Sequence, residues 1–312
     1  MARIVYAGSP DFAVPALQSL LHSSHEVVAV LTQPDRPAGR GRQLRPSPVK
    51  LVAEQAGVRV LQPEALSESL LQAQLKALTI DLMVVAAYGQ LLPVEVLEMP
   101  RAGCVNLHAS LLPRWRGASP IQTAILAGDK QTGVSLMRME AGLDTGAVYA
   151  TVSTDIRGDD TGGSLHDRLA QLGAGLLEQN LDALVAGSLR PEPQSEAGVS
   201  YAPRLAKADG VIDWQQSAAE IDCRIRAFNP WPVARTALNG EPLRCLMSAV
   251  AETGNEHRAD AGAVTGVRGD ALCVQTGAGE LLLQTVQLPG RKPVSGKQLA
   301  GTLQTDGLVL GR

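Results

Sequence analysis

Three polar residues of types that can catalyse acyl transfer stand out in the 312-residue sequence. Asn106 and His108 lie two positions apart at the end of an apolar run that is typical of a β-strand, so both side chains would project from the same face. Asp144 follows a second apolar run, inside the glycine-bracketed turn 142–146. An amide N–H can stabilise the oxygen of a carbonyl that becomes tetrahedral, an imidazole can transfer a proton, and a carboxylate can favour the protonated imidazole. The set suits acyl transfer to an amine without a covalent enzyme intermediate.

Each of the three residues also fits a purely structural role. A histidine at the end of a strand is often a packing or surface residue, an asparagine often caps an element, and an aspartate beside glycines is an ordinary turn residue. If all three were structural, the chain would be a non-catalytic module that only binds RNA or a small molecule.

Motifs for nucleotide cofactors are missing from the sequence. The first predicted strand runs into AGSPDF, which lacks the G-x-G-x-x-G spacing, and no G-x-x-x-x-G-K-[ST] occurs. The four cysteines are far apart and show no metal-ligand spacing, so we expect neither a metal site nor a disulfide framework. The N-terminus has the features of neither a signal peptide nor a membrane anchor, and we expect a reducing, cytoplasmic location.

Alternating β-branched and helix-period stretches predict that a doubly wound, mostly parallel α/β sheet positions these residues. In such sheets ligands bind at the carboxyl ends of the strands, where Asn106 and His108 are expected. The predicted strands are 3–7, 26–32, 81–87 and 103–108, and the predicted helices are 48–56, 67–78 and 164–185.

The length of the chain predicts two domains. Residues 187–200 are rich in Gly, Pro, Ser and Glu, which is typical of an exposed connector, so we expect a first domain at 1–188, a linker at 189–206 and a second domain at 207–312. The second domain has one predicted helix, 218–227, followed by short Val- and Leu-rich runs that predict a small β-barrel. The net charge of −3 is uneven, with 16 basic and 20 acidic residues in 1–203 against 12 and 11 in 204–312.

The segment Asp35–Lys50 has five basic residues, one acidic residue and glycines beside arginines. Such a run is commonly a solvated loop, but it also suits contact with a phosphate backbone and folding on binding. Phe12, Trp115 and Trp231 are expected to pack, because aromatic residues make up only 3% of the chain. A weaker signal for nucleic-acid binding comes from basic residues of the second half, which could contact successive phosphates of a nucleic acid or simply keep a barrel soluble. These residues are Arg204, Lys207, Arg224, Arg226, Arg291, Lys292 and Lys297.

The sequence resembles the methionyl-tRNA formyltransferase family, within the wider set of 10-formyltetrahydrofolate-dependent formyltransferases. The wider set shares the N-x-H pattern and the distant aspartate, and the other segments resemble the methionyl-tRNA branch along nearly the whole chain. The segments are AGSPDFAVPAL, TQPDRPAGRGRQLRPSPVK, VVAAYGQLLP, NLHASLLPRWRGASPIQ, GLDTG and RIRAFNPWP.

The resemblance implies transfer of a formyl group to the amino group of methionine on initiator tRNA, by a Rossmann-like domain followed by an OB-like barrel. Asn106 would donate to the formyl oxygen, His108 would stabilise that oxygen and pass a proton to the departing folate nitrogen, and Asp144 would assist with a water or orient His108. The residues implied to contact 10-formyltetrahydrofolate are Ser110, Leu111, Leu112, Pro113, Ala87, Tyr88, Gly89 and Leu92.

The resemblance also implies that Arg42, with Arg40 beside it, reads the end of the acceptor stem, and that Arg36, Arg45 and Lys207 contact the tRNA. We expect no metal and a monomer. Within the same chemistry the alternative acceptors are glycinamide ribonucleotide, an amino sugar nucleotide or water. The arginine-rich segment and the C-terminal barrel favour tRNA over these acceptors.

Overall fold

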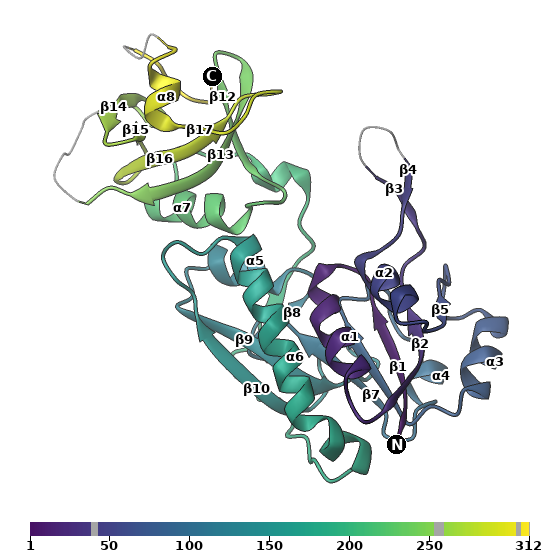
Figure 1. Ribbon diagram of the computed structural model, residues 1–312. Helices are drawn as coiled ribbons and strands as arrows, with labels where there is room; N and C mark the ends of the chain where they lie inside the picture. Colours follow the sequence, from purple (N-terminus) through teal and green to yellow (C-terminus); the bar gives the residue numbers. More distant parts are fainter. Residues whose placement is uncertain (39–42, 253–258, 304–306, 312) are drawn as a thin grey trace. The chain divides into compact units, whose positions relative to one another are not determined.

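A computed structural model describes residues 1–38, 43–252, 259–303 and 307–311. Arg40 and Arg42, which were expected to contact tRNA, lie outside the described residues. The chain divides into two compact units (Figure 1). The first comprises Met1–Pro120, Gln131–Asp155 and His166–Ala202, and the second comprises Ile121–Lys130, Ile156–Leu165 and Pro203–Arg312.

A seven-stranded sheet forms the middle of the first unit, in the order β10-β9-β7-β6-β1-β2-β5. Five neighbouring strands run parallel, namely β5, β2, β1, β6 and β7. The strand β9 pairs antiparallel with both β7 and β10. The predicted mostly parallel sheet is therefore confirmed. Its strands are β1 (Arg3–Gly8), β2 (Glu26–Leu31), β5 (Val60–Leu61), β6 (Leu82–Ala86), β7 (Cys104–His108), β9 (Gln131–Arg138) and β10 (Val148–Asp155).

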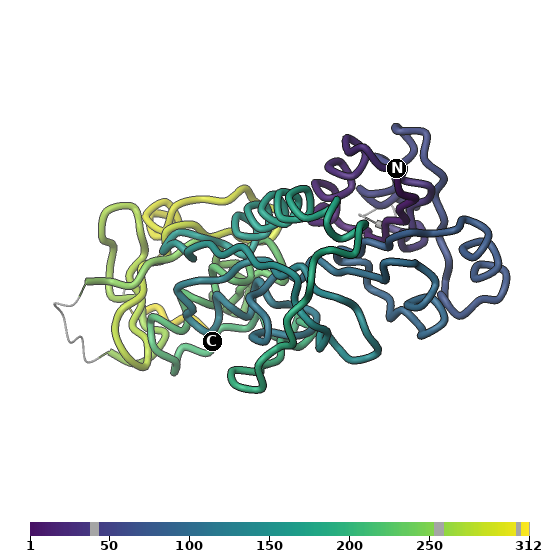
Figure 2. The backbone as a smooth tube through the Cα atoms, turned by 90° about the horizontal axis from the view of Figure 1, so that it is seen from below, coloured from purple at the N-terminus to yellow at the C-terminus, as the bar shows by residue number. Residues whose placement is uncertain are grey.

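The strands at the centre of the sheet are buried because helices cover it. All five residues of β6 are buried, as expected for an unbroken apolar run. Leu17 and Leu20 of α1 are fully buried, and Ser47 caps α2 by accepting a hydrogen bond from the Lys50 N–H. The helices of the first unit are η1 (Asp11–Ala13), α1 (Val14–Leu21), α2 (Pro48–Gln55), α3 (Ser69–Ala77), α4 (Val94–Leu97) and most of α6 (Gly162–Ala186), whose long coil is visible in Figures 1 and 2. The helix α5 (Pro120–Leu126) belongs to the second unit from Ile121 onward.

The second unit contains an antiparallel sheet in the order β12-β13-β16-β15-β14, with β17 paired to β16. Ser217 and Glu220 form a capping box at the start of α7, whose Ile221 and Ile225 lie in the core of this unit. Among the described residues no pairing joins β14 to β12, so a closed OB-like barrel stays a prediction. The elements are η2 (Lys207–Gly210), α7 (Ala218–Ala227), β12 (Ala234–Leu238), β13 (Glu241–Val250), β14 (Val264–Arg268), β15 (Ala271–Gln275), β16 (Glu280–Gln287), β17 (Val294–Ser295) and α8 (Gly296–Ala300).

Part of the predicted connector is integrated into the first unit. Glu192 forms an isolated bridge with Val148, and β11 (Tyr201–Ala202) pairs in parallel with β8 (Arg116–Gly117). The segment 190–202 therefore packs along the loops that follow β7 and β9. We name this segment the strap.

Two expectations about individual residues were wrong. Trp231 was expected to pack, but 49% of it is exposed. Arg226 was considered for phosphate contact, but it is buried and donates to the Asp222 carboxylate at 2.7 Å and to the Asp160 carbonyl at 3.2 Å. A buried, paired guanidinium supports packing rather than RNA binding.

No helix within the described part of the chain has both the length and the apolar character needed to cross a bilayer.

Candidate active site

The strand β7 places Asn106 and His108 on one face of the sheet, as their spacing predicted. His108 is buried, whereas Asn106 is partly exposed. Within the described part of the chain the Asn106 side-chain amide makes no hydrogen bond. It is therefore a donor that remains available to a substrate.

Asp144 reaches the same place from the loop between β9 and β10. Its Oδ2 atom lies 3.6 Å from Nδ1 of His108 and accepts a hydrogen bond of 2.8 Å from the Gly117 N–H. The residue has a φ of 51°, in the left-handed region that aspartate adopts more readily than most residues. The backbone of Gly117 thus holds the carboxylate beside the imidazole.

The other imidazole nitrogen of His108 faces the backbone. Nε2 lies 2.9 Å from the carbonyl oxygen of Trp115, a residue with a φ of 62°. A left-handed conformation is uncommon for such a bulky side chain, and uncommon backbone conformations of this kind gather at functional sites. Oxygen acceptors therefore face both ring nitrogens of His108.

The loop Ser110–Pro113, expected to contact folate, is tied to the sheet by hydroxyl groups. The Ser110 hydroxyl donates to the Arg114 carbonyl at 2.6 Å, and the Ser135 hydroxyl of β9 donates to the Ser110 carbonyl and accepts from the Leu112 N–H. Ser110 is fully buried, whereas Leu111, Leu112 and Pro113 are partly exposed. Ser110 shapes the loop, and the next three residues remain partly accessible to solvent.

The segment after β6, also expected to contact folate, likewise contains both buried and exposed residues. Tyr88 and Leu92 are buried in the core cluster of the sheet, and burial raises the pKa of the Tyr88 hydroxyl. Ala87 and Gly89 are exposed and both have positive φ, 45° and 81°. Of the four residues in this segment expected to contact folate, only Ala87 and Gly89 are therefore accessible.

Arg36 and Arg45, two of the residues expected to contact tRNA, lie on the hairpin formed by β3 (Arg36–Ala38) and β4 (Gln43–Arg45), which projects from the sheet (Figure 1). They are directly opposite one another and both are exposed. Like charges in this arrangement repel, which favours an anion between them. At the base of the hairpin, the Lys50 ammonium and the Gln62 amide donate to Asp35 at 2.7 Å each and hold the pKa of the Asp35 carboxyl below its usual range.

Lys207, the remaining residue expected to contact tRNA, is exposed at the start of η2. Its carbonyl accepts a hydrogen bond from the Arg235 guanidinium, and its ammonium group faces solvent. It belongs to the second unit, whereas the hairpin belongs to the first.

Several residues around the candidate site carry no sequence signal of their own. The hydroxyl of Ser200 in the strap accepts from the Trp115 N–H, and the side chain of Gln194 contacts both Arg116 and the backbone around Asp144. No motif pointed to them, because Gln194 lies among Pro, Ser and Glu residues typical of a connector. The only signal is structural: Gln194 is half-buried within an otherwise exposed stretch, 192–198.

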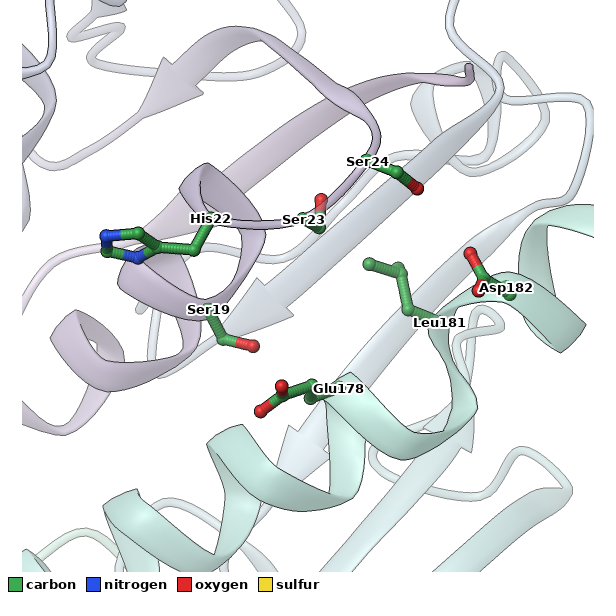
Figure 3. Close-up of a pocket in the computed structure, with 7 residues that line it drawn as sticks. All are labelled: Ser19, His22, Ser23, Ser24, Glu178, Leu181 and Asp182. Atoms are coloured by element: carbon green, nitrogen blue, oxygen red, sulfur yellow. The ribbon is translucent and has the colours of Figure 1, made fainter.

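A separate hollow of about 330 Å³ lies between the end of α1 and the C-terminal part of α6 (Figure 3). Ser19, His22, Glu178 and Asp182 line it, and Asp182 also accepts from His25 at 2.9 Å. It contains none of the predicted site residues. Within the described ranges no group of three or more His, Cys, Asp or Glu side chains is arranged to hold a metal ion.

Two family models match this chain and define its class of protein. Residues 2–181 match the family model described as formyl transferase, and residues 204–303 match the formyl transferase C-terminal domain. A solved N-formyltransferase from Helicobacter canadensis, in complex with folinic acid and dTDP-3-aminofucose, has the same fold, with a TM-score of 0.66 and 19% identity over 91% of this chain and 99% of that one. The chain is thus a formyl transferase.

Closer relatives define the branch. The chain is 51% identical to the methionyl-tRNA formyltransferase of Stutzerimonas stutzeri, over 99% of this chain and 98% of that protein, and 51% identical to that of Methylobacillus flagellatus, over 96% of each. This chain belongs to the methionyl-tRNA formyltransferase family.

Proposed function

We propose that this enzyme transfers the formyl group of 10-formyltetrahydrofolate to the amino group of methionyl-initiator-tRNA, with Asn106, His108 and Asp144 as its catalytic groups. The observation that carries the proposal is the free amide of Asn106 on the same strand face as an imidazole that lies 3.6 Å from a carboxylate. Such an arrangement supplies a donor where negative charge develops and a route for protons beside it.

Each catalytic group acts at a defined point of the reaction. As the amine nitrogen bonds to the formyl carbon, Asn106 donates to the formyl oxygen, whose charge increases. His108 gives a proton to the folate nitrogen while the bond from that nitrogen to the formyl carbon breaks. Asp144, with a water, accepts the proton that the amine loses, so the proton count balances.

His108 has to turn away from one of its present acceptors to reach a substrate. Its Nε2 atom is paired with the Trp115 carbonyl, and the Asp144 carboxylate is shared with Gly117. Catalytic hydrogen bonds often tighten only when the substrate is bound. We infer that the folate substrate replaces the Trp115 carbonyl as the partner of Nε2.

The reduced folate would lie on the exposed ends of two neighbouring strands. Ala87 and Gly89 follow β6, and Leu111, Leu112 and Pro113 follow β7, which pairs with it. Small residues and peptide groups on one side and apolar side chains on the other suit a flat pterin with hydrogen-bonding edges. The folinic acid in the related N-formyltransferase supports this choice of donor.

The tRNA would be held by arginines of the β3–β4 hairpin and by Lys207. Arg36 and Arg45 are exposed and occupy paired positions of the hairpin, and guanidinium groups suit phosphate recognition. Arg40 and Arg42 remain our predictions for contacts at the end of the acceptor stem. We place the enzyme in the cytoplasm, where it would act as a monomer.

The experiment that tests the proposed function is an acceptor comparison. The purified chain is incubated with 10-formyltetrahydrofolate and either methionyl-initiator-tRNA, glycinamide ribonucleotide or an amino sugar nucleotide, and the formylated product is measured. We expect product with the tRNA alone. Equal or greater turnover of a small amine would refute the acceptor, and no turnover of any acceptor would refute the enzymatic function.

A further inference from the structure

We propose that Gln194 is a positioning residue that holds Asp144 in place for formyl transfer. The inference rests on the proposed function, because Asp144 is a catalytic group only within it. Gln194 lies in the strap, beyond residues 2–181 that match the formyl transferase model and before residues 204–303 that match its C-terminal domain.

The side-chain amide of Gln194 makes four hydrogen bonds within the first unit. Its Oε1 atom accepts from Nε and Nη2 of Arg116, at 3.1 and 2.7 Å. Its Nε2 atom donates to the carbonyls of Asp144 and Gly146, at 2.8 Å each. Both donor hydrogens and both lone pairs of the amide oxygen are therefore used.

This arrangement allows only one orientation of the amide and favours glutamine among residues of similar size. A flipped amide would put its NH₂ group against the Arg116 guanidinium and its oxygen against two carbonyls. A glutamate could still accept from Arg116, but its carboxylate would repel the carbonyls of Asp144 and Gly146. An alanine would leave all four partners without this hydrogen bonding.

The two carbonyls that Gln194 binds flank Thr145, in the turn that gives Asp144 its left-handed backbone. Arg116, the other partner of Gln194, directly precedes Gly117, whose N–H holds the Asp144 carboxylate. Gln194 thus joins the backbone of Asp144 to the segment that binds its side chain. Because Gln194 approaches neither His108 nor Asn106 in these contacts, it acts through Asp144.

The backbone of the strap is anchored on both sides of Gln194, so the amide has a fixed base. Glu192 bridges Val148 in both directions at 2.8 Å, and Ser200 accepts from the N–H groups of Trp115 and Arg116 at 3.0 and 2.9 Å. A catalytic group misplaced by about 1 Å can cost roughly 100-fold in rate. Removal of the Gln194 amide is expected to act in this way.

The test compares Gln194→Ala and Gln194→Glu with the parent enzyme and with Gln287→Ala. Gln287 is a matched control, since it also accepts from an arginine, Arg244, and donates to a backbone carbonyl, that of Arg291, but in the second unit. We expect kcat for formylation of methionyl-tRNA to fall by about 10- to 100-fold in both Gln194 variants. KM for the formyl donor should change little, and Gln287→Ala should keep the parental kcat.

Two further measurements distinguish positioning from a general loss of folding. Amide exchange of Gly117, measured by NMR without substrates, should accelerate in the Gln194 variants, while amides of the β1–β6 ladder keep their protection. The kcat of Gln194→Glu relative to the parent should rise as the pH is lowered towards about 4.3, where a protonated carboxyl regains one donor.

Parental kcat in Gln194→Glu at neutral pH, or unchanged Gly117 exchange in both variants, would overturn the inference. Global loss of protection in both variants would also overturn it, because Gln194 would then stabilise the whole unit. The exchange measurement needs no substrate, so failure of the inference is separable from failure of the parent enzyme to formylate tRNA.

Discussion

Oδ2 of Asp144 lies between two partners: Nδ1 of His108 at 3.6 Å and the N–H of Gly117 at 2.8 Å. The shorter contact is the hydrogen bond to the backbone, and the longer one joins the two titratable side chains. The position of the carboxylate is thus set by the main chain that follows Trp115. The same backbone contact leaves the carboxyl group beside the imidazole.

Asp144→Asn should keep the shape of the site and remove its charge. A carboxamide oxygen can still accept from Gly117, so the midpoint of thermal unfolding should change little, while kcat falls by about 100-fold or more. Formylation kinetics and thermal melts measure the two effects. A kcat within about twofold of the parent would show that Asp144 only shapes the loop.

Asn106→Ala should lower kcat by on the order of 100-fold without lowering stability. The Asn106 amide has no partner in the described part of the chain, so its removal leaves no buried group unpaired. Asn180→Ala is a suitable control, because that amide bonds the Leu176 carbonyl within α6. Comparable activity losses in the two variants would contradict the role of Asn106 as the donor to the formyl oxygen.

Gly117→Ala should damage both folding and catalysis. A Cβ on Gly117 would lie 2.6 Å from the Ala202 carbonyl, and the φ of 117° is strained for any other residue. We expect β8 to separate from β11 and the hydrogen bond to Asp144 to weaken, which lowers both the melting temperature and kcat.

Gly128→Ala provides the comparison for that variant. Gly128 also has a positive φ, 69°, but no atom lies within 4 Å of an added Cβ, so only the conformational cost of about 1 to 2 kcal/mol applies. Its kcat should remain parental. An equal loss of kcat in both glycine variants would indicate a general effect of destabilisation.

Arg36→Ala and Arg45→Ala should weaken tRNA use without reducing stability. Because the two arginines are opposite one another, removing either relieves repulsion in the free protein. KM for methionyl-tRNA should rise, while KM for the folate stays constant. The slope of log KM against log salt concentration should become less steep by about 0.9 for each phosphate that the variant no longer binds. Lys76→Ala, at an exposed position of α3, is the control.

Asp81 should make the stability of the first unit depend on pH. The Arg3 backbone N–H at 2.8 Å and the Arg101 guanidinium at 3.1 Å hold the pKa of Asp81 below its usual range. A carboxyl with a lowered folded-state pKa stabilises the fold above its unfolded value of about 3.9, and this contribution is lost as the pH falls through the folded value.

Asp81→Asn should therefore lower the melting temperature at pH 7, and the difference from the parent should shrink in acid. Thermal melts across the acidic range check this expectation. Asp159→Asn, at an exposed position, is the control for the loss of one acidic side chain. A difference for Asp81→Asn that stays constant with pH would argue that packing rather than charge is lost.

The parallel sheet and the candidate trio could be predicted because both depend on local patterns. The apolar run of β6 and the two-residue spacing of Asn106 and His108 specify a buried strand and a shared face. The predicted helix 218–227 has the observed bounds, since Ser217 and Glu220 form a recognisable capping box. Whether Asn106, His108 and Asp144 catalyse the reaction stays a prediction for the experiments above.

Features that depend on contacts between distant segments could not be predicted. Tyr88 and Leu92 fit the family motif, but only the packing of β6 against its neighbours shows that their side chains are buried. The hydrogen bonds of Ser135 to the loop at Ser110 and of Gln194 to Asp144 join segments with no shared motif. In such cases the residue type permits many partners, and tertiary structure selects one.

The pairing of β11 with β8 limits where the chain can be truncated to isolate the first unit. A fragment that ended at residue 188 would retain Asn106, His108 and Asp144 but would lose Glu192, Gln194 and Ser200. The shortest fragment that retains these residues and the whole β11–β8 pairing extends through Ala202. A first domain designed from composition alone would therefore carry all three candidate groups and lack the strap contacts that hold the backbone around them.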